Sequence, residues 1–155
     1  MLAILIMNRE LAILCVEDDE NDVWMMLRVF KKLGLSSPVH VCRDGEEARA
    51  YIQGSGTYGD RARFQFPNLI ISDLKMPKMG GFEMLEWLRT ETPYAALPVI
   101  VLTSSKEEAD IHRAYQLGAN SYAVKPRDLT GLENFIKATV EYWVWCESPQ
   151  PVVNR

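Results

Sequence analysis

The sequence has little that would anchor it in a membrane. Its apolar start, Met1–Met7, is far shorter than the ~20 residues that span a bilayer. The start also lacks the basic leader and the small-residue cleavage site of a signal peptide. We therefore expect neither a transmembrane segment nor a signal peptide, and the sequence leaves open whether translation begins at Met1 or at Met7.

Cysteine is also scarce, and basic residues are outnumbered by acidic ones. The three cysteines, Cys15, Cys42 and Cys146, show neither paired C-x-x-C spacing nor the density of a disulfide scaffold, so we expect free thiols in a reducing cytoplasm. Lys and Arg number 17 against 21 Asp and Glu, which gives a formal net charge of −4. Because nucleic-acid phosphates select basic surfaces, nucleic acid is not expected to be the main partner.

What the sequence does contain is a regular alternation of short apolar runs and amphipathic segments. At 155 residues, 48% of them hydrophobic, the chain can form one domain with a full core. The predicted strands are Leu11–Val16, Val39–Cys42, Leu69–Ser72, Val99–Thr103 and Ser121–Val124. The predicted helices cover about 23–33, 46–53, 82–89, 107–117 and 130–145. This βα order favours an α/β fold, a flavodoxin-like doubly wound parallel sheet of five strands in the order 2-1-3-4-5.

Two of the helices show an apolar face at helical spacing. In the first, the face is predicted to hold Val23, Met26, Leu27, Phe30 and Leu33, with Gly34 as the stop. In the last, it is predicted to hold Leu132, Phe135, Ile136, Val140 and Trp143.

A glycine-rich string, residues 54–59, fits G-x-G-x-x-G to the letter. A dinucleotide site needs that string to follow a strand and open a helix, so that the phosphates meet a helix N-terminus. Here it follows a predicted helix and leads into a polar segment. We interpret it as a loop.

Acidic residues stand at the ends of two strands that this topology makes neighbours. Glu17 and Asp18 follow the first strand, and Asp73 follows the third. Carboxylates ~5 Å apart repel by roughly 3 kcal/mol per pair at an effective dielectric constant near 20, which a hard cation such as Mg²⁺ relieves. The acids just beyond, Asp19, Glu20 and Asp22, are explained equally well as capping a helix N-terminus.

Two other strands end in groups that complement the acids. Thr103 closes the fourth strand with a hydroxyl, and Lys125 follows the fifth strand with an ammonium group. Taken singly, Thr103 could cap a turn and Lys125 could be a solvated charge. Together with the acids they form a set that is difficult to obtain by chance.

The set resembles the receiver domain of two-component response regulators, the CheY-like family. Four strings carry the resemblance: residues 13–18 (ILCVED), 73–77 (DLKMP), 102–105 (LTSS) and 124–126 (VKP). Residues 53–67, 117–122 and 135–143 are similar to single-domain regulators that pair with phytochrome-type histidine kinases. The resemblance implies an N-terminal extension at 1–10, a receiver domain at 11–147 and a tail at 148–155.

The resemblance implies that Asp73 is the phosphoacceptor. Mg²⁺ would be bound by Asp18, by Asp73, by Glu17 through water and by the backbone carbonyl of Lys75. Thr103 would hydrogen-bond a phosphoryl oxygen.

Lys125 would pair with the phosphoryl charge, and Tyr122 would be the aromatic switch residue. Gly80 stands where the family often has Asp, at a position that is no proposed ligand. His112 is expected to be an exposed, inert side chain.

By the same resemblance the protein is a phosphoacceptor that signals, rather than an enzyme. Its partners would be a sensor histidine kinase and a downstream protein target, with the fourth helix, fifth strand and fifth helix as the output surface. The aromatic residues Tyr142, Trp143 and Trp145 predict a docking surface or a homodimer.

Three alternatives are weighed against this interpretation. One is a pseudo-receiver that acts as an unphosphorylated scaffold, and another is a flavodoxin-like cofactor binder. A D-x-D phosphatase is disfavoured because Lys75 occupies the second acidic position.

Overall fold

The structure, a computed structural model, describes residues 10–35 and 37–149. Most of the predicted extension, residues 1–9, lies outside the described residues, and so does the end of the predicted tail, residues 150–155. The alternative starts at Met1 and Met7 lie there as well.

Five parallel strands form one sheet in the order β2-β1-β3-β4-β5. The strands are β1 (Ile13–Val16), β2 (His40–Cys42), β3 (Leu69–Ser72), β4 (Val99–Thr103) and β5 (Ser121–Val124). This confirms the predicted fold class and strand order. The register places Val16 opposite Ser72, so β1 and β3 end at the same level of the sheet.

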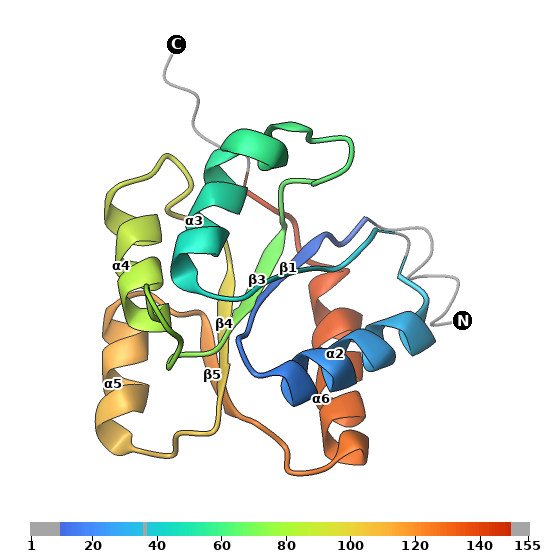
Figure 1. Cartoon of the computed structure of the whole chain (residues 1–155). Coiled ribbons are helices and arrows are strands. Elements are labelled where there is room, and N and C mark those ends of the chain that lie inside the picture. The colour runs from blue at the N-terminus through green and yellow to red at the C-terminus, as the bar shows by residue number, and fades with distance from the viewer. Residues whose placement is uncertain (1–9, 36, 150–155) are drawn as a thin grey trace.

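Helices cover both faces of this sheet (Figure 1). They are α2 (Glu20–Leu33), α3 (Gly45–Gln53), α4 (Gly81–Thr90), α5 (Glu108–Gln116) and α6 (Leu129–Trp143). Helices α2 and α6 pack on one face and α3, α4 and α5 on the other, each set over its own buried apolar cluster. The continuous apolar strands are what a sheet buried on both faces requires.

Helix α2 begins three residues before its predicted range and ends at the residue before Gly34, as predicted. The Asp19 side chain accepts a hydrogen bond from the Asp22 backbone N–H, which caps the N-terminus. Gly34 takes a left-handed conformation (φ 65°) after the last turn, a conformation that glycine adopts without steric cost.

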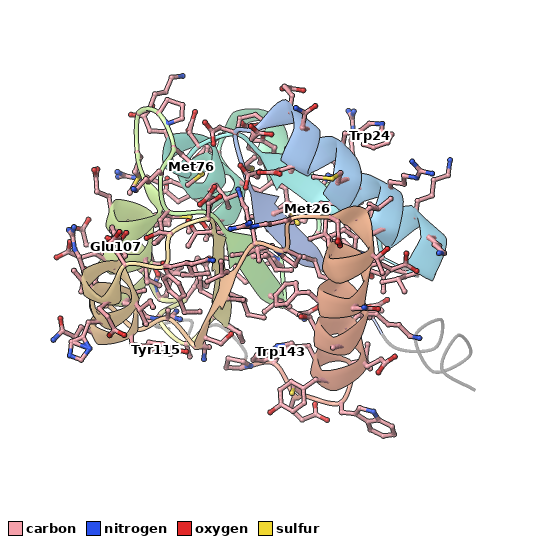
Figure 2. All side chains as sticks on the ribbon, turned by 90° about the horizontal axis from the view of Figure 1, so that it is seen from below. Trp24, Met26, Met76, Glu107, Tyr115 and Trp143 are labelled. Atoms are coloured by element: carbon pink, nitrogen blue, oxygen red, sulfur yellow. The ribbon has the colours of Figure 1, made fainter. Side chains whose placement is uncertain are left out.

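The predicted apolar face of α2 is wrong at one position. Met26 is 3% exposed and points into the space between α2 and α6, whereas Trp24 is 59% exposed and projects away from the molecule (Figure 2). Leu27, predicted to be buried, is 40% exposed, and Val29 is buried in its place. Because α2 packs against both the sheet and α6, its buried stripe is turned toward Val29. In α6, Phe135 and Trp143 pack only partly buried against the core.

The glycine-rich string opens no α-helix. Helix α3 ends at Gly54, and residues Gly56–Gly59 form a short 3₁₀ helix, η1. Arg61 donates hydrogen bonds of 2.8 Å to the carbonyls of Tyr51 and Ile52, which satisfies the end of α3. The segment is therefore a structural connection, as expected.

The remaining general expectations concern membranes and thiols. Among the residues that the structure describes, no helix is long and apolar enough to cross a bilayer. Cys15 and Cys42 are buried, Cys146 is half-buried, and all three are free thiols. His112 is exposed on α5, as expected.

Candidate functional site

Three carboxylates converge at the edge where β1 and β3 end. Each of Glu17, Asp18 and Asp73 offers an oxygen atom, and these three atoms all lie within 4.8 Å of one another. The backbone holds them there, because the Asp73 N–H donates to the Val16 carbonyl at 2.9 Å. The convergence predicted from the strand ends is therefore present.

An ammonium group lies against these acids. The Nζ of Lys125 is 2.8 Å from Glu17 Oε2, 2.7 Å from Asp73 Oδ2 and 2.7 Å from Asp22 Oδ2. The Lys125 side chain is 13% exposed. Burial disfavours its charge, but the hydrogen bonds to Asp22, Asp73 and Glu17 outweigh burial and raise the pKa of Lys125.

Even with the Lys125 ammonium group present, negative charge at the site remains energetically unfavourable. Glu17 is 2% exposed, and burial raises its pKa to about 7, with a further contribution from the charge of Asp73. The hydrogen bond from Lys125 opposes that rise. The three carboxylates supply hard oxygen ligands, and one of them, Glu17, resists ionisation. Such a set of oxygen ligands fits Mg²⁺ or a similar divalent cation.

Both carboxylate oxygens of Asp73 are held in place. Oδ1 accepts a 2.7 Å hydrogen bond from the Leu74 N–H, and Oδ2 faces Lys125. The loop that follows is folded tightly on itself: the Gly81 N–H donates to the Leu74 carbonyl at 2.9 Å, and a Cβ at Gly81 would overlap the Asp73 carbonyl oxygen. The Lys75 side chain is exposed on this loop.

The other two predicted residues lie on β4 and β5. Thr103 is 2% exposed at the end of β4, and its carbonyl accepts a 2.8 Å hydrogen bond from the Lys125 N–H, so it neighbours the lysine. Tyr122 is half-buried on β5, and its hydroxyl donates to the Ser105 carbonyl at 2.9 Å. Ser105 in turn donates from its own hydroxyl to Asp110 on α5. These contacts join Tyr122 to the first turn of α5.

Asp22 is the site residue that the sequence did not single out. Its position in the first turn of α2 suggested a helix-end role, and its N–H does donate to the capping Asp19 carboxylate. Its own carboxylate, however, pairs with Lys125. No local sequence signal marked this contact, because Lys125 lies 103 residues further along the chain.

The sequence of the chain matches a known protein family. The sequence profile of the response regulator receiver domain matches residues 13–137. The chain belongs to that family. This confirms the resemblance to two-component receiver domains that the motifs indicated.

Among relatives of similar length, Rcp1 and RcpA support a phytochrome-associated subgroup. The chain is 34% identical to response regulator Rcp1 of Synechocystis over 88% of this chain and 91% of Rcp1. It is 34% identical to the probable methanogenesis regulatory protein FilR2 of Methanothrix harundinacea over 90% and 88% of the two chains. The crystal structure of the phosphorylated cyanobacterial phytochrome response regulator RcpA matches with a TM-score of 0.81 and 32% identity, over 91% of this chain and 99% of RcpA.

One structural relative bears on the acidic trio. A solved structure of Rcp1 is described as its Mn(2+)-bound form, and it matches this receiver domain with a TM-score of 0.80 and 32% identity, over 91% of this chain and all of that one. The convergence of Glu17, Asp18 and Asp73 in this chain is consistent with the binding of a divalent cation.

Proposed function

We propose that this receiver domain accepts a phosphoryl group on Asp73 in a Mg²⁺-dependent reaction and signals through the conformational change that follows. The observation that carries the proposal is the setting of Asp73: one oxygen bonded by a backbone N–H, the other by Lys125, and two further acids beside it. That setting combines an oriented nucleophile, a fixed cation and a metal donor set.

The chemistry assigned to each residue follows from phosphoryl-transfer physics. An Asp73 carboxylate oxygen forms a bond to phosphorus while the bond to the donor breaks, and the bonding electrons leave with the donor. Lys125 stabilises negative charge on the phosphoryl oxygens, and the Thr103 hydroxyl donates to one of them. Mg²⁺ held by Glu17, Asp18, Asp73 and the Lys75 carbonyl would supply further neutralisation of the same charge.

The signal is proposed to leave by α5, β5 and α6. A phosphoryl group adds about −1.5 to −2 charges, which would draw Thr103 and Lys125 toward it. Tyr122 lies next to this region and is hydrogen-bonded to Ser105, ahead of α5. A shift of Thr103 would therefore be transmitted to the first turn of α5.

The test is phosphorylation by a small donor. Acetyl phosphate with Mg²⁺ should add the mass of one phosphoryl group to the intact protein, and EDTA should abolish the gain. Asp73→Asn should take up none, whereas the matched control Asp60→Asn, at an exposed loop acid, should behave as the wild type. No mass gain in any of the proteins would favour the scaffold alternative.

We propose a sensor histidine kinase of the phytochrome type as the donor in the cell, because the phytochrome regulator RcpA is similar over nearly its whole length. Phosphotransfer profiling against a panel of purified kinases should give the fastest transfer with a phytochrome-type kinase. Faster transfer from an unrelated kinase would refute this assignment.

The free thiols of Cys15 and Cys42 support a cytoplasmic location.

For the output we propose protein contact, with a downstream target or a second copy of this chain. Tyr142 and Trp145 at the end of α6 are 64% and 59% exposed, and beside them a groove of about 530 Å³ includes Phe135 and Trp143 in its lining. Exposed aromatic side chains of this kind are enriched at interfaces. Light scattering should give a dimer mass with a phosphate mimic bound, and a monomer both with and without it would exclude the homodimer.

A further inference from the structure

The Lys125 ammonium has three protons, and three carboxylates surround it. Two of these, Glu17 and Asp73, belong to the trio that would bind the cation. The third, Asp22 at 2.7 Å, lies outside that trio and comes from the first turn of α2. The lysine is therefore linked to one acid that has no other assigned role in the reaction.

We infer that Asp22 is a positioning residue, which holds the Lys125 ammonium beside Asp73 throughout phosphoryl transfer. The inference rests on the proposed function. During the transfer Asp73 becomes an acyl phosphate, and Glu17 would bind the cation, so both residues change their charge or their partners. Asp22 neither accepts the phosphoryl group nor binds the cation, and its contact with Lys125 can persist.

The surroundings of Asp22 suit this role. Its N–H donates to the Asp19 carboxylate at 2.9 Å, which fixes the backbone of this turn relative to the end of β1. Its side chain is 28% exposed, so its charge is less costly than that of the buried Glu17. Lysine has a long flexible stem, and a fixed counter-charge restricts where its ammonium group can lie before the reaction starts.

A matched pair of variants tests the inference. Asp22→Asn keeps the shape of the side chain and removes its charge. Glu20→Gln makes the same charge change in the same turn, at an 83% exposed residue whose partner is Arg43 rather than Lys125. Asp22→Glu restores the carboxylate and should recover part of any loss.

Phosphorylation by acetyl phosphate at saturating Mg²⁺ gives the decisive rates. Asp22→Asn should lower the maximal rate by roughly tenfold, with little change in the KM for acetyl phosphate. This estimate lies between no effect and the roughly hundredfold loss of rate that a ~1 Å misplacement of a reacting group can cause. Glu20→Gln should stay within about twofold of the wild type, since it touches neither Lys125 nor the acids. In NMR relaxation, the ε-methylene of Lys125 should become more mobile in Asp22→Asn and not in Glu20→Gln.

The outcomes separate the two claims. An unchanged or faster maximal rate in Asp22→Asn, beside an active wild type, overturns the inference and leaves the proposed function standing. An equal loss in Glu20→Gln also overturns it, because the cause would then be general charge. A wild type that takes up no phosphoryl group contradicts both the proposed function and the role of Asp22 in it.

Discussion

Removing the Lys125 charge should destabilise the metal-free protein and make it depend on Mg²⁺. Each pair of charges in the acidic trio, at separations within 4.8 Å, repels by about 3.5 kcal/mol or more at an effective dielectric constant near 20. Lys125 offsets this repulsion through contacts of 2.7–2.8 Å. Removing one partner of a buried ion pair typically costs about 3–5 kcal/mol. Partial protonation of Glu17 softens the loss, so we expect Lys125→Gln to lower the free energy of unfolding by about 3 kcal/mol in EDTA.

Urea unfolding in EDTA and in excess Mg²⁺ measures the effect. Because Lys125 competes with the cation for the same oxygens, Lys125→Gln should bind Mg²⁺ at least tenfold more tightly. Excess Mg²⁺ should then stabilise the variant by about 1.4 kcal/mol more than the wild type. Lys137→Gln, at an exposed position on α6, is the control and should change neither quantity. A loss below about 1 kcal/mol in EDTA, or an equal gain from Mg²⁺ in variant and wild type, would refute the reasoning.

Three further predictions concern protons and packing. A proton competes with the cation for Glu17, because the pKa of Glu17 is raised to about 7. The Mg²⁺ dissociation constant, measured by calorimetry, should therefore rise by about tenfold per pH unit below 7. A dissociation constant that does not change with pH would contradict this. Gly81→Ala places a methyl group on the Asp73 carbonyl oxygen and should cost about 1–3 kcal/mol of stability and most phosphoryl uptake; a fully active variant would show that the loop yields. Burial lowers the pKa of His40 below its ordinary 6.5. The stability that neutral His40 contributes is therefore present above pH 6.5 and is lost as the pH falls through the folded pKa. In urea unfolding, His40→Phe should lose less stability than the wild type over that pH range.

Much of the fold was accessible from the sequence because strand ends and helix stops are local signals. The strands Leu69–Ser72, Val99–Thr103 and Ser121–Val124 were predicted to the residue. The first strand was predicted two residues too long, since Leu11 and Ala12 are buried without pairing as strand. Burial explains an apolar run, but hydrogen-bonded pairing decides where a strand begins.

The errors arose where tertiary packing decides the outcome. Apolar spacing located α2 but not its rotation about its own axis, which places Leu27 outside and Val29 inside. In the same way the sequence indicated Asp22 as a helix-end acid. Its contact with Lys125, 103 residues away, depends on how α2 lies against the end of β5. Contacts of that range have no local sequence signal.

The acidic trio itself was predictable because its members follow adjacent parallel strands, whose carboxyl ends meet at one edge. Thr103 and Lys125 follow the same rule. The assignment of chemical roles to these residues goes further than position, and it stays a prediction until phosphorylation is measured.

The most direct measurement is to locate the phosphoryl group in the protein. After incubation with acetyl phosphate and Mg²⁺, borohydride reduction of an aspartyl phosphate leaves a homoserine that peptide mass spectrometry can map. We expect this mark at Asp73 alone, and none when EDTA replaces Mg²⁺. A mark at Asp18, at Asp22 or at any other residue, or uptake that is indifferent to the cation, would contradict this expectation.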